Sequence, residues 1–179
     1  MDALTKPELL RLLAAARAHS ERDFLMILVA YCHGLRASEV TAIQRDDIKD
    51  GCLDVERLKG SRRTKQALVN HENPLLDERF ALSAFIEKLR PKQKVFPITR
   101  RQFDRIIKRH AVTAELPEHK RHAHMLKHTI GTEIYEKSKD LRLVRAHLGH
   151  ARESSSLIYS GRFEEQEAGE QVQALLSSE

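Results

Sequence analysis

The sequence predicts a mainly α-helical domain with one small antiparallel β-sheet or hairpin. Apolar residues recur at three- and four-residue intervals along most of the 179-residue chain, which is the period of amphipathic helices. One central stretch instead alternates apolar and polar residues on both sides of a glycine-containing turn. Hydrophobic residues make up 41% of the chain, so a core can form, and the length fits a single domain.

Three helices are expected in the first 48 residues. Thr5 is a suitable N-cap for the first helix, and Pro7 fits its first turn, where a missing N–H breaks no intrahelical hydrogen bond. The second helix is mostly apolar and should be buried, and Gly34 marks its end. Ser38 and Glu39 stand near the start of the third, shorter helix. The predicted helices cover residues 4–19, 21–35 and 36–48.

The predicted β-element follows these helices. "CLDVERL" (52–58) alternates apolar and polar residues, and "QALVNH" (66–71) is a short β-like run. The segment between them, "KGSRRTK" (59–65), contains a glycine and four basic residues. This pattern is typical of two antiparallel strands joined by a basic turn.

Helical periodicity then returns. Pro91 should end the first of the later helices, and a short break at Lys139–Asp140 separates two others. The chain lacks internal repeats and long linkers, so we expect residues 1–179 to form one domain. The remaining predicted elements are helices over 73–91, 101–116, 123–138 and 141–150, a turn-and-helix segment over 153–161, and a terminal helix over 164–177.

Basic residues are concentrated in the middle of the chain. The formal net charge is only +5, but residues 57–66 carry five basic residues and no acid, and residues 88–109 carry nine basic residues and one acid. From Phe163 to the end there are acids but no Lys or Arg. This distribution favours a polyanionic partner such as nucleic acid, although a solvated surface would show the same charges.

Membrane and exported proteins are not favoured by the sequence. It contains no run of 18 apolar residues, and its N-terminus lacks the basic-then-apolar layout of a signal peptide. Cys32 and Cys52 stand in unrelated contexts, and we expect them to be reduced thiols in the cytoplasm. Two thiols without a pairing motif do not predict a metal site.

Several polar residues suggest chemistry, although each has an ordinary structural interpretation. Arg36 follows Gly34 where a helix begins, as many surface arginines do. His124 and His128 are one helical turn apart, which suits either a metal pair or an ordinary helix face. We expect His110, His119 and His122 to lie near the surface without a role.

Taken together, these residues show a recognisable order. The chain resembles the tyrosine recombinase (phage integrase) family from "LTKPEL" to its last helix. The spacing of "LGH" and a tyrosine nine residues later is the most specific part of the resemblance. The matching positions are Arg36 in "GLRASEV", Lys59 in the basic turn, His124 and Lys127 in "HMLKH", His150 in "LGH", and Tyr159.

The resemblance implies a recombinase catalytic-domain fold and site-specific cutting and rejoining of DNA through a 3′-phosphotyrosine, without metal or cofactor. It makes Tyr159 the nucleophile and Lys59 the general acid for the leaving 5′-oxygen. It places Arg36 and His150 on non-bridging phosphate oxygens, and His124 as proton acceptor or orienting group. Guanidinium donors suit this chemistry because negative charge grows on those oxygens in the transition state. No GxxxxGK[ST] nucleotide-binding motif is present.

Lys127 departs from the family pattern, which has arginine there. An ammonium keeps the charge but lacks the planar fork that contacts two oxygens. Three consequences are open: slower chemistry, a site adapted to lysine, or compensation by Arg121. A DNA-binding regulator with weak or lost cleavage is therefore the alternative function. Glu39, three residues after Arg36, either supports its guanidinium or favours the helix N-terminus.

The resemblance also implies double-stranded DNA as partner. We expect a monomer without DNA and a multimer on DNA, with the terminal helix packing on its own domain or docking on a neighbouring subunit. The expected N-terminal DNA-clamping domain is absent from this chain, which suits either a catalytic-domain fragment or a minimal recombinase. Integrase, resolvase and invertase roles are not distinguished. The expected DNA contacts are Arg62, Arg63, Lys65, Arg100, Arg101, Arg105, Lys108 and Arg109.

Overall fold

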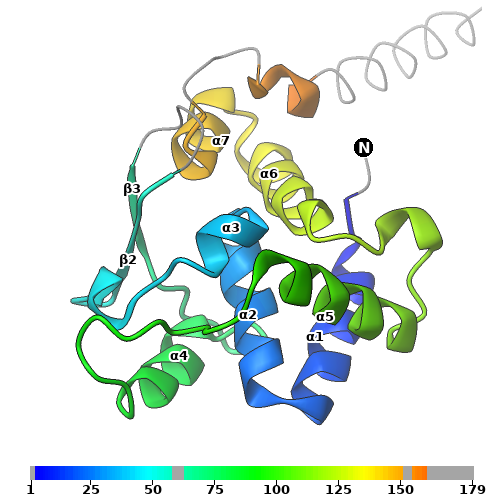
Figure 1. The fold of residues 1–179 in the computed structure, drawn as a ribbon. Helices are drawn as coiled ribbons and strands as arrows, with labels where there is room; N and C mark the ends of the chain where they lie inside the picture. The colour runs from blue at the N-terminus through cyan, green and yellow to red at the C-terminus, as the bar shows by residue number, and fades with distance from the viewer. Residues whose placement is uncertain (1–2, 58–62, 151–154, 161–179) are drawn as a thin grey trace, which may run out of the picture.

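Helices build most of the domain around a central apolar helix. The computed structural model describes residues 3–57, 63–150 and 155–160 (Figure 1). The helix α2 contacts α1, α3, α4 and α6, and its side chains are buried nearly all round because the sequence "FLMILVAYC" has no polar face. The α-helices of the described residues are α1 (Lys6–His19), α2 (Glu21–Cys32), α3 (Ala37–Val40), α4 (Glu78–Ile86), α5 (Arg100–Thr113), α6 (His124–Ser138) and α7 (Leu141–Leu148).

The first helices begin and end where the local sequence predicts. The Thr5 hydroxyl accepts a hydrogen bond from the Glu8 N–H, and the Glu8 carboxylate accepts one from the Thr5 N–H, which makes a capping box. After α2 the chain turns at Gly34, whose φ of 59° lies in the left-handed region. A Cβ at Gly34 would overlap the Leu148 side chain, so this glycine also lets α7 approach the end of α2.

The β-element is a three-stranded antiparallel sheet in the order β1-β2-β3, with β1 (Ile48–Lys49), β2 (Cys52–Val55) and β3 (Thr64–Ala67). Leu53 pairs with Ile48 on one side and with Gln66 on the other. Leu53 and Val55 point into the core, as the alternation predicts. The sheet stands beside α7, which contacts β3 (Figure 1).

Two predicted helices are shorter than expected. The helix predicted over 36–48 stops at Val40 and is followed by a 3₁₀ turn (Arg45–Asp47) and β1. There the backbone pairs with a distant segment, because the Arg45 N–H donates to the Gln93 carbonyl and the Val95 N–H to the Ile43 carbonyl. The helix predicted over 73–91 runs only over Glu78–Ile86, with Asp77 as its N-cap.

One surface prediction is wrong. His110 is only 2% exposed and its Nε2 lies 2.9 Å from Oδ2 of Asp23, which is also buried. An ion pair joins the same carboxylate to Arg109. Burial raises the pKa of Asp23, but hydrogen bonds from His110 and Arg22 outweigh this effect, and the pKa lies below its usual value.

Some predicted elements lie outside the described residues. These are the terminal helix over 164–177 and the part of the basic turn over 58–62 that carries Lys59 and Arg62. Within the described ranges, no helix has the length and apolar character needed to span a membrane.

Candidate active site

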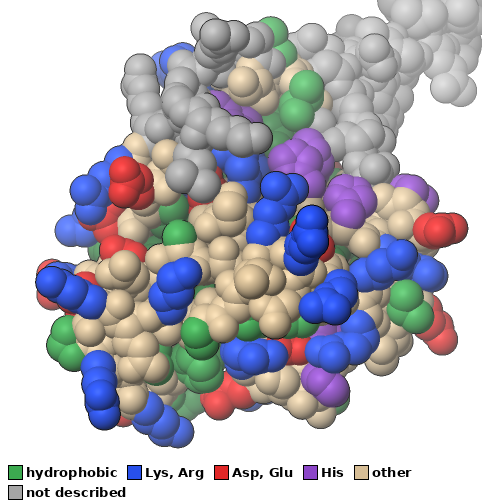
Figure 2. All heavy atoms as spheres, viewed as in Figure 1, with side chains coloured by type: hydrophobic (Ala, Val, Ile, Leu, Met, Phe, Trp, Pro, Cys, Tyr) green, Lys and Arg blue, Asp and Glu red, His purple; other side chains and the backbone are tan. Residues whose placement is uncertain are grey.

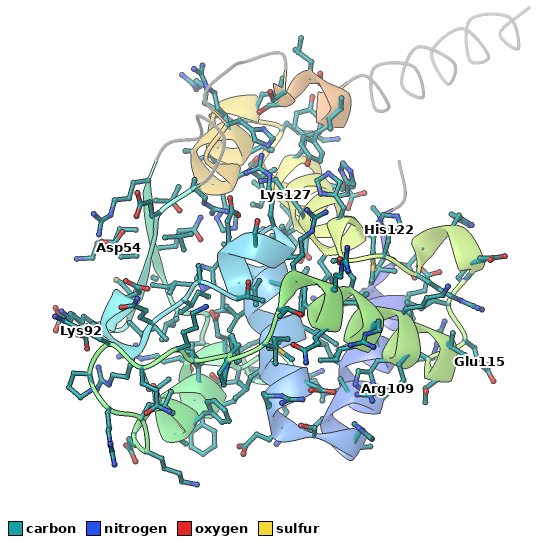
Figure 3. The ribbon with its side chains drawn as sticks, in the orientation of Figure 1. Asp54, Lys92, Arg109, Glu115, His122 and Lys127 are labelled. Atoms are coloured by element: carbon teal, nitrogen blue, oxygen red, sulfur yellow. The ribbon has the colours of Figure 1, made fainter. Side chains whose placement is uncertain are left out.

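Most of the predicted catalytic residues lie at the ends of helices on one side of the domain. Arg36 immediately precedes α3, and His124 and Lys127 lie in the first turn of α6. His150 follows the end of α7 at Gly149. In Figure 3, Lys127 and His122 are labelled near the start of α6. Arg109, also labelled there, lies toward the C-terminal end of α5.

Arg36 is held by Glu39. Its Nη1 lies 2.9 Å from Oε1 of Glu39, and its backbone N–H donates to Oε2 at 2.8 Å. The Glu39 side chain is fully buried, whereas the Arg36 side chain is 29% exposed and can reach a ligand. Both interpretations of Glu39 are thus correct at once, since one carboxylate supports the guanidinium and closes the start of α3.

Lys127 is buried close to Arg36 and to Arg57, a residue that follows strand β2. The residue is 2% exposed, and its Nζ donates to the Leu148 carbonyl at 3.1 Å. Burial, together with the positive charges of Arg36 and Arg57, lowers the pKa of Lys127 to about 7. The Lys127 amine is therefore a buried group whose positive charge is disfavoured by two neighbouring cations.

The two histidines respond to the same cations. Burial and the charges of Lys127, Arg36 and Arg57 lower the pKa of His150 to about 4. Burial and Lys127 also lower the pKa of His124. Both imidazoles are consequently neutral at pH 7. The Nδ1 atom of His150 lies 3.0 Å from the Ser156 hydroxyl, which fixes the ring orientation.

Tyr159 packs on α6 one turn beyond Lys127. A Cβ placed on Gly131 would lie 2.6 Å from two carbons of the Tyr159 ring, so the ring rests directly on the helix backbone. Tyr159 is 2% exposed and shares an apolar cluster with Tyr135, Val144 and Leu148. Burial raises its pKa, and the phenol is therefore protonated at neutral pH.

Arg57 is a site residue that the sequence interpretation missed. It is buried, and its guanidinium pairs with Oε2 of Glu39, whereas the guanidinium of Arg36 pairs with Oε1. The signal was present, because Leu53, Val55 and Arg57 alternate on the same side of the extended chain and the first two are core residues. An arginine on the inward face of such a pattern must find buried partners.

Arg121 does not occupy the position suggested for it. Its Nε donates to the Leu116 carbonyl at 2.7 Å, a contact that holds the loop before α6. The structure therefore shows the Arg121 guanidinium engaged with backbone rather than directed to Lys127.

The predicted DNA-contacting residues of α5 lie on its exposed side. Figure 2 shows Lys and Arg side chains gathered over α5 and close to the histidines near the start of α6. A cavity of about 320 Å³ joins this surface to the site, and its lining includes Arg36, Arg100, His122 and His124. The exposed basic residues of α5 are Arg100, Arg101, Arg105, Lys108 and Arg109.

On the sheet, Lys65 is exposed, and Arg63 forms an exposed ion pair with Asp54, with 2.7 Å between Nε and Oδ1. Arg109 is partly committed elsewhere, through its contact with Asp23.

The histidine-rich segment makes ring contacts. The rings of His124 and His128 meet edge to face, with centroids 4.5 Å apart. In the described part of the chain, no group of three or more His, Cys, Asp or Glu side chains is arranged to hold a metal ion.

Comparisons with known proteins agree with this geometry. The Phage integrase family matches residues 2–165. The chain is 32% identical over 173 residues to the type 1 fimbriae regulatory protein FimB of Escherichia coli K12, covering 89% of this chain and 86% of FimB. It is 29% identical to the tyrosine recombinase XerA of Thermococcus kodakarensis, covering 88% of this chain and 57% of XerA.

Solved structures share the fold. A XerH site-specific recombinase bound to its difH substrate in a pre-cleavage complex superposes with a TM-score of 0.70 at 24% identity, covering 94% of this chain and 52% of that chain. The lambda integrase catalytic core superposes with a TM-score of 0.68 at 21% identity, covering 85% of this chain and 93% of that one. The chain therefore belongs to the phage integrase family, the family of the tyrosine site-specific recombinases.

Proposed function

We propose that this chain is the catalytic domain of a site-specific recombinase that cuts and rejoins DNA through a 3′-phosphotyrosine intermediate. One observation carries the proposal. Arg36 and His124 line one cavity, and the buried Lys127 amine donates to the Leu148 carbonyl, two residues before His150. Residues spread over more than a hundred positions of sequence thus surround one positive site, beside the turn of α6 against which the Tyr159 ring packs.

In the proposed cleavage step Tyr159 leaves the apolar cluster in which it is buried. Its oxygen then attacks phosphorus, so that a phosphorus–phenol oxygen bond forms and the bond to the 5′-oxygen breaks. The phenol proton passes to His124, which is neutral at pH 7 and can accept it. Lys59 supplies a proton to the 5′-oxygen. Rejoining reverses both transfers with a 5′-hydroxyl of another strand, and the phosphodiester energy is kept in the covalent intermediate.

The cations act on the non-bridging oxygens. Arg36 offers a guanidinium that Glu39 already orients, so little reorganisation is needed when phosphate arrives. Lys127 supplies a second charge, and His150 a neutral imidazole. Phosphate binding raises the pKa of Lys127, since an added negative charge favours the ammonium form.

The partner in this proposal is double-stranded DNA. The exposed basic residues of α5 and the sheet hold the backbone, which makes binding sensitive to salt. The protein is a monomer without DNA and a multimer on DNA, and residues 164–177, for which the sequence predicts a helix, dock on a neighbour or pack on their own domain. It acts in the cytoplasm.

A DNA-binding regulator with weak or lost cleavage is the second candidate. Two observations favour it: Lys127 offers one donor nitrogen where a guanidinium would offer three, and the relative FimB is named a regulatory protein. In this case the same basic surface binds DNA, but the covalent step is absent.

A nicked DNA substrate separates the two candidates. A nick just beyond the cleavage site lets the freed fragment diffuse away, so the covalent complex accumulates and appears as a slow band in a denaturing gel. The recombinase forms this band on DNA flanking its own gene, and Tyr159→Phe abolishes it while binding DNA equally well. DNA binding without any covalent band in the wild type supports the regulator.

A further inference from the structure

Arg57 is the last residue that the structure describes before residue 63, and each N–H group of its guanidinium has an acceptor. Its Nε donates to the Thr64 hydroxyl at 3.0 Å. Nη1 donates to the Gly34 carbonyl at 3.1 Å and to Oε2 of Glu39 at 3.4 Å. Nη2 donates to the carbonyls of His33 at 2.8 Å and His147 at 3.0 Å. A guanidinium has five N–H groups, so none remains for a phosphate.

These acceptors belong to the elements that carry the proposed catalytic residues. The carbonyls of His33 and Gly34 lie just after the end of α2, three and two residues before Arg36. The His147 carbonyl lies in the last turn of α7, three residues before His150. Helix C-termini leave carbonyls without intrahelical partners and carry partial negative charge, so a buried cation is favourable there.

Other contacts join the same two helix ends. The Gln66 amide donates to the His147 carbonyl at 2.5 Å, and its oxygen lies 2.6 Å from Nδ1 of His33. The Nε2 atom of His147 lies 2.8 Å from the Cys32 carbonyl. The end of α2, the end of α7 and β3 therefore form one hydrogen-bonded unit, with Arg57 as its charged member.

We propose that Arg57 is a positioning residue that fixes Arg36, His150 and the described chain on both sides of residues 58–62 in one arrangement. The proposal rests on the proposed function. Arg57 acts on Arg36 through Glu39, whose carboxylate it shares, and on His150 through the last turn of α7. It joins the two ends of the described chain that flank Lys59, because Arg57 itself, two residues after β2, donates to Thr64 at the start of β3.

The fork is what this position requires. The five acceptors of Arg57 are divided among three nitrogens, which the planar guanidinium holds in fixed geometry. A lysine keeps the charge beside Glu39 but has only three donors on one nitrogen, so it cannot satisfy all these groups. Arg57→Lys therefore tests geometry with charge retained, and Arg57→Met tests removal of both.

The cleavage assay uses the nicked DNA with the whole chain. Arg57→Met forms the covalent complex about 100-fold more slowly, as expected for a misplacement of about 1 Å. Arg57→Lys is about 10-fold slower, and both variants bind DNA within threefold of the wild type with an unchanged salt slope. Arg11→Met is the matched control, because Arg11 also donates to a helix-end carbonyl, that of Ala114, and its cleavage rate stays within twofold.

A substrate with sulfur in place of the bridging 5′-oxygen identifies what Arg57 positions. A thiolate leaves without protonation, so this substrate bypasses the general acid. The sulfur substrate restores part of the cleavage rate of the Arg57 variants, because the general acid Lys59 is only one of the three groups that the variants displace, beside Arg36 and His150. Full restoration means that only the turn is held, and no restoration means that it is not held; either result overturns the three-way arrangement.

Backbone hydrogen exchange gives a measurement independent of activity. Exchange over residues 33–40 and 145–150 rises in both Arg57 variants and not in Arg11→Met. Unchanged exchange overturns the proposal, as does a cleavage rate within threefold of the wild type or a rate loss matched by weaker DNA binding. If the wild type forms no Tyr159-dependent band, the proposed function fails, and the exchange result alone decides whether Arg57 holds the helix ends. If Arg57→Met does not fold, Arg57→Lys decides.

Discussion

Replacing Lys127 by methionine should make the protein more stable at pH 6 and slightly less stable at pH 10. Lys127 is buried beside Arg36 and Arg57, and the carboxylate of Glu39 is shared among these cations. Methionine has nearly the same length and shape but no charge. The substitution therefore removes an unfavourable buried charge together with one hydrogen bond, to the Leu148 carbonyl.

The magnitude follows from the pKa of Lys127. A fall from 10.5 to about 7 corresponds to roughly 5 kcal/mol at about 1.4 kcal/mol per unit. The folded protein releases the proton near pH 7 and the unfolded chain near 10.5, so the unfolded state binds more protons between these values and stability rises with pH there. Loss of the hydrogen bond to the Leu148 carbonyl costs about 2 kcal/mol of the stability gained by removing the buried charge. The net gain in Lys127→Met is about 3 kcal/mol at pH 6.

Urea denaturation at pH 6, 8 and 10 measures the difference in unfolding free energy between variant and wild type. The advantage of Lys127→Met should shrink at each step and change sign by pH 10. Lys137→Met is the control, because Lys137 lies on the same helix but its side chain is 74% exposed. A variant less stable than the wild type at pH 6, or a difference that does not depend on pH, would show that the buried ammonium is not unfavourable.

Three further predictions concern other parts of the molecule. Arg105→Ala lowers the slope of log binding constant against log salt by about 1, while Arg17→Ala, on α1, leaves it unchanged in the same titrations. Asp23→Ala loses about 3–5 kcal/mol of unfolding free energy at pH 7 by urea denaturation, and the loss diminishes as pH falls below the usual Asp pKa of 3.8, where the wild-type carboxylate protonates. Gly131→Ala displaces the Tyr159 ring, so nitration of Tyr159 by tetranitromethane, measured by mass spectrometry, rises. Unchanged nitration of Tyr159, together with the stability gain of about 1 kcal/mol that alanine gives over glycine in a helix, would contradict the ring contact.

The sequence predicted the elements whose signals are local. The Thr5 cap, the turn at Gly34 and the alternation of Leu53 with Val55 each involve neighbours within four residues, and each is found as expected. The mainly helical fold and the family are also confirmed. The order of the motifs made Arg36 a candidate site residue without any knowledge of the fold, because the family resemblance depends on motif order and spacing in the sequence.

Features that depend on distant partners could not be predicted. The helix expected over 36–48 gives way because Ile43 and Arg45 find backbone partners in residues 93–95, which no local pattern shows. His110 is buried because Asp23, on another helix, provides an acceptor. The alternation with Leu53 and Val55 could have placed Arg57 on the inward face, but its acceptors, which distinguish it from the exposed Arg63, include carbonyls of distant segments that the sequence does not show.

The electrostatics of the site suggest why a lysine can stand where the family has arginine. A guanidinium at residue 127 would stay charged at all accessible pH values and would repel Arg36 and Arg57 whether or not DNA is bound. A lysine with a pKa of about 7 can lose its proton in the free protein and regain it beside a phosphate. On the proposed function, this site acquires its full charge only as DNA binds. DNA binding above pH 7 then takes up a proton, and affinity should weaken by up to tenfold per pH unit there. Lys127→Arg should remove this dependence, because its charge no longer changes, and wild-type affinity that is constant from pH 7 to 9 would exclude the coupling.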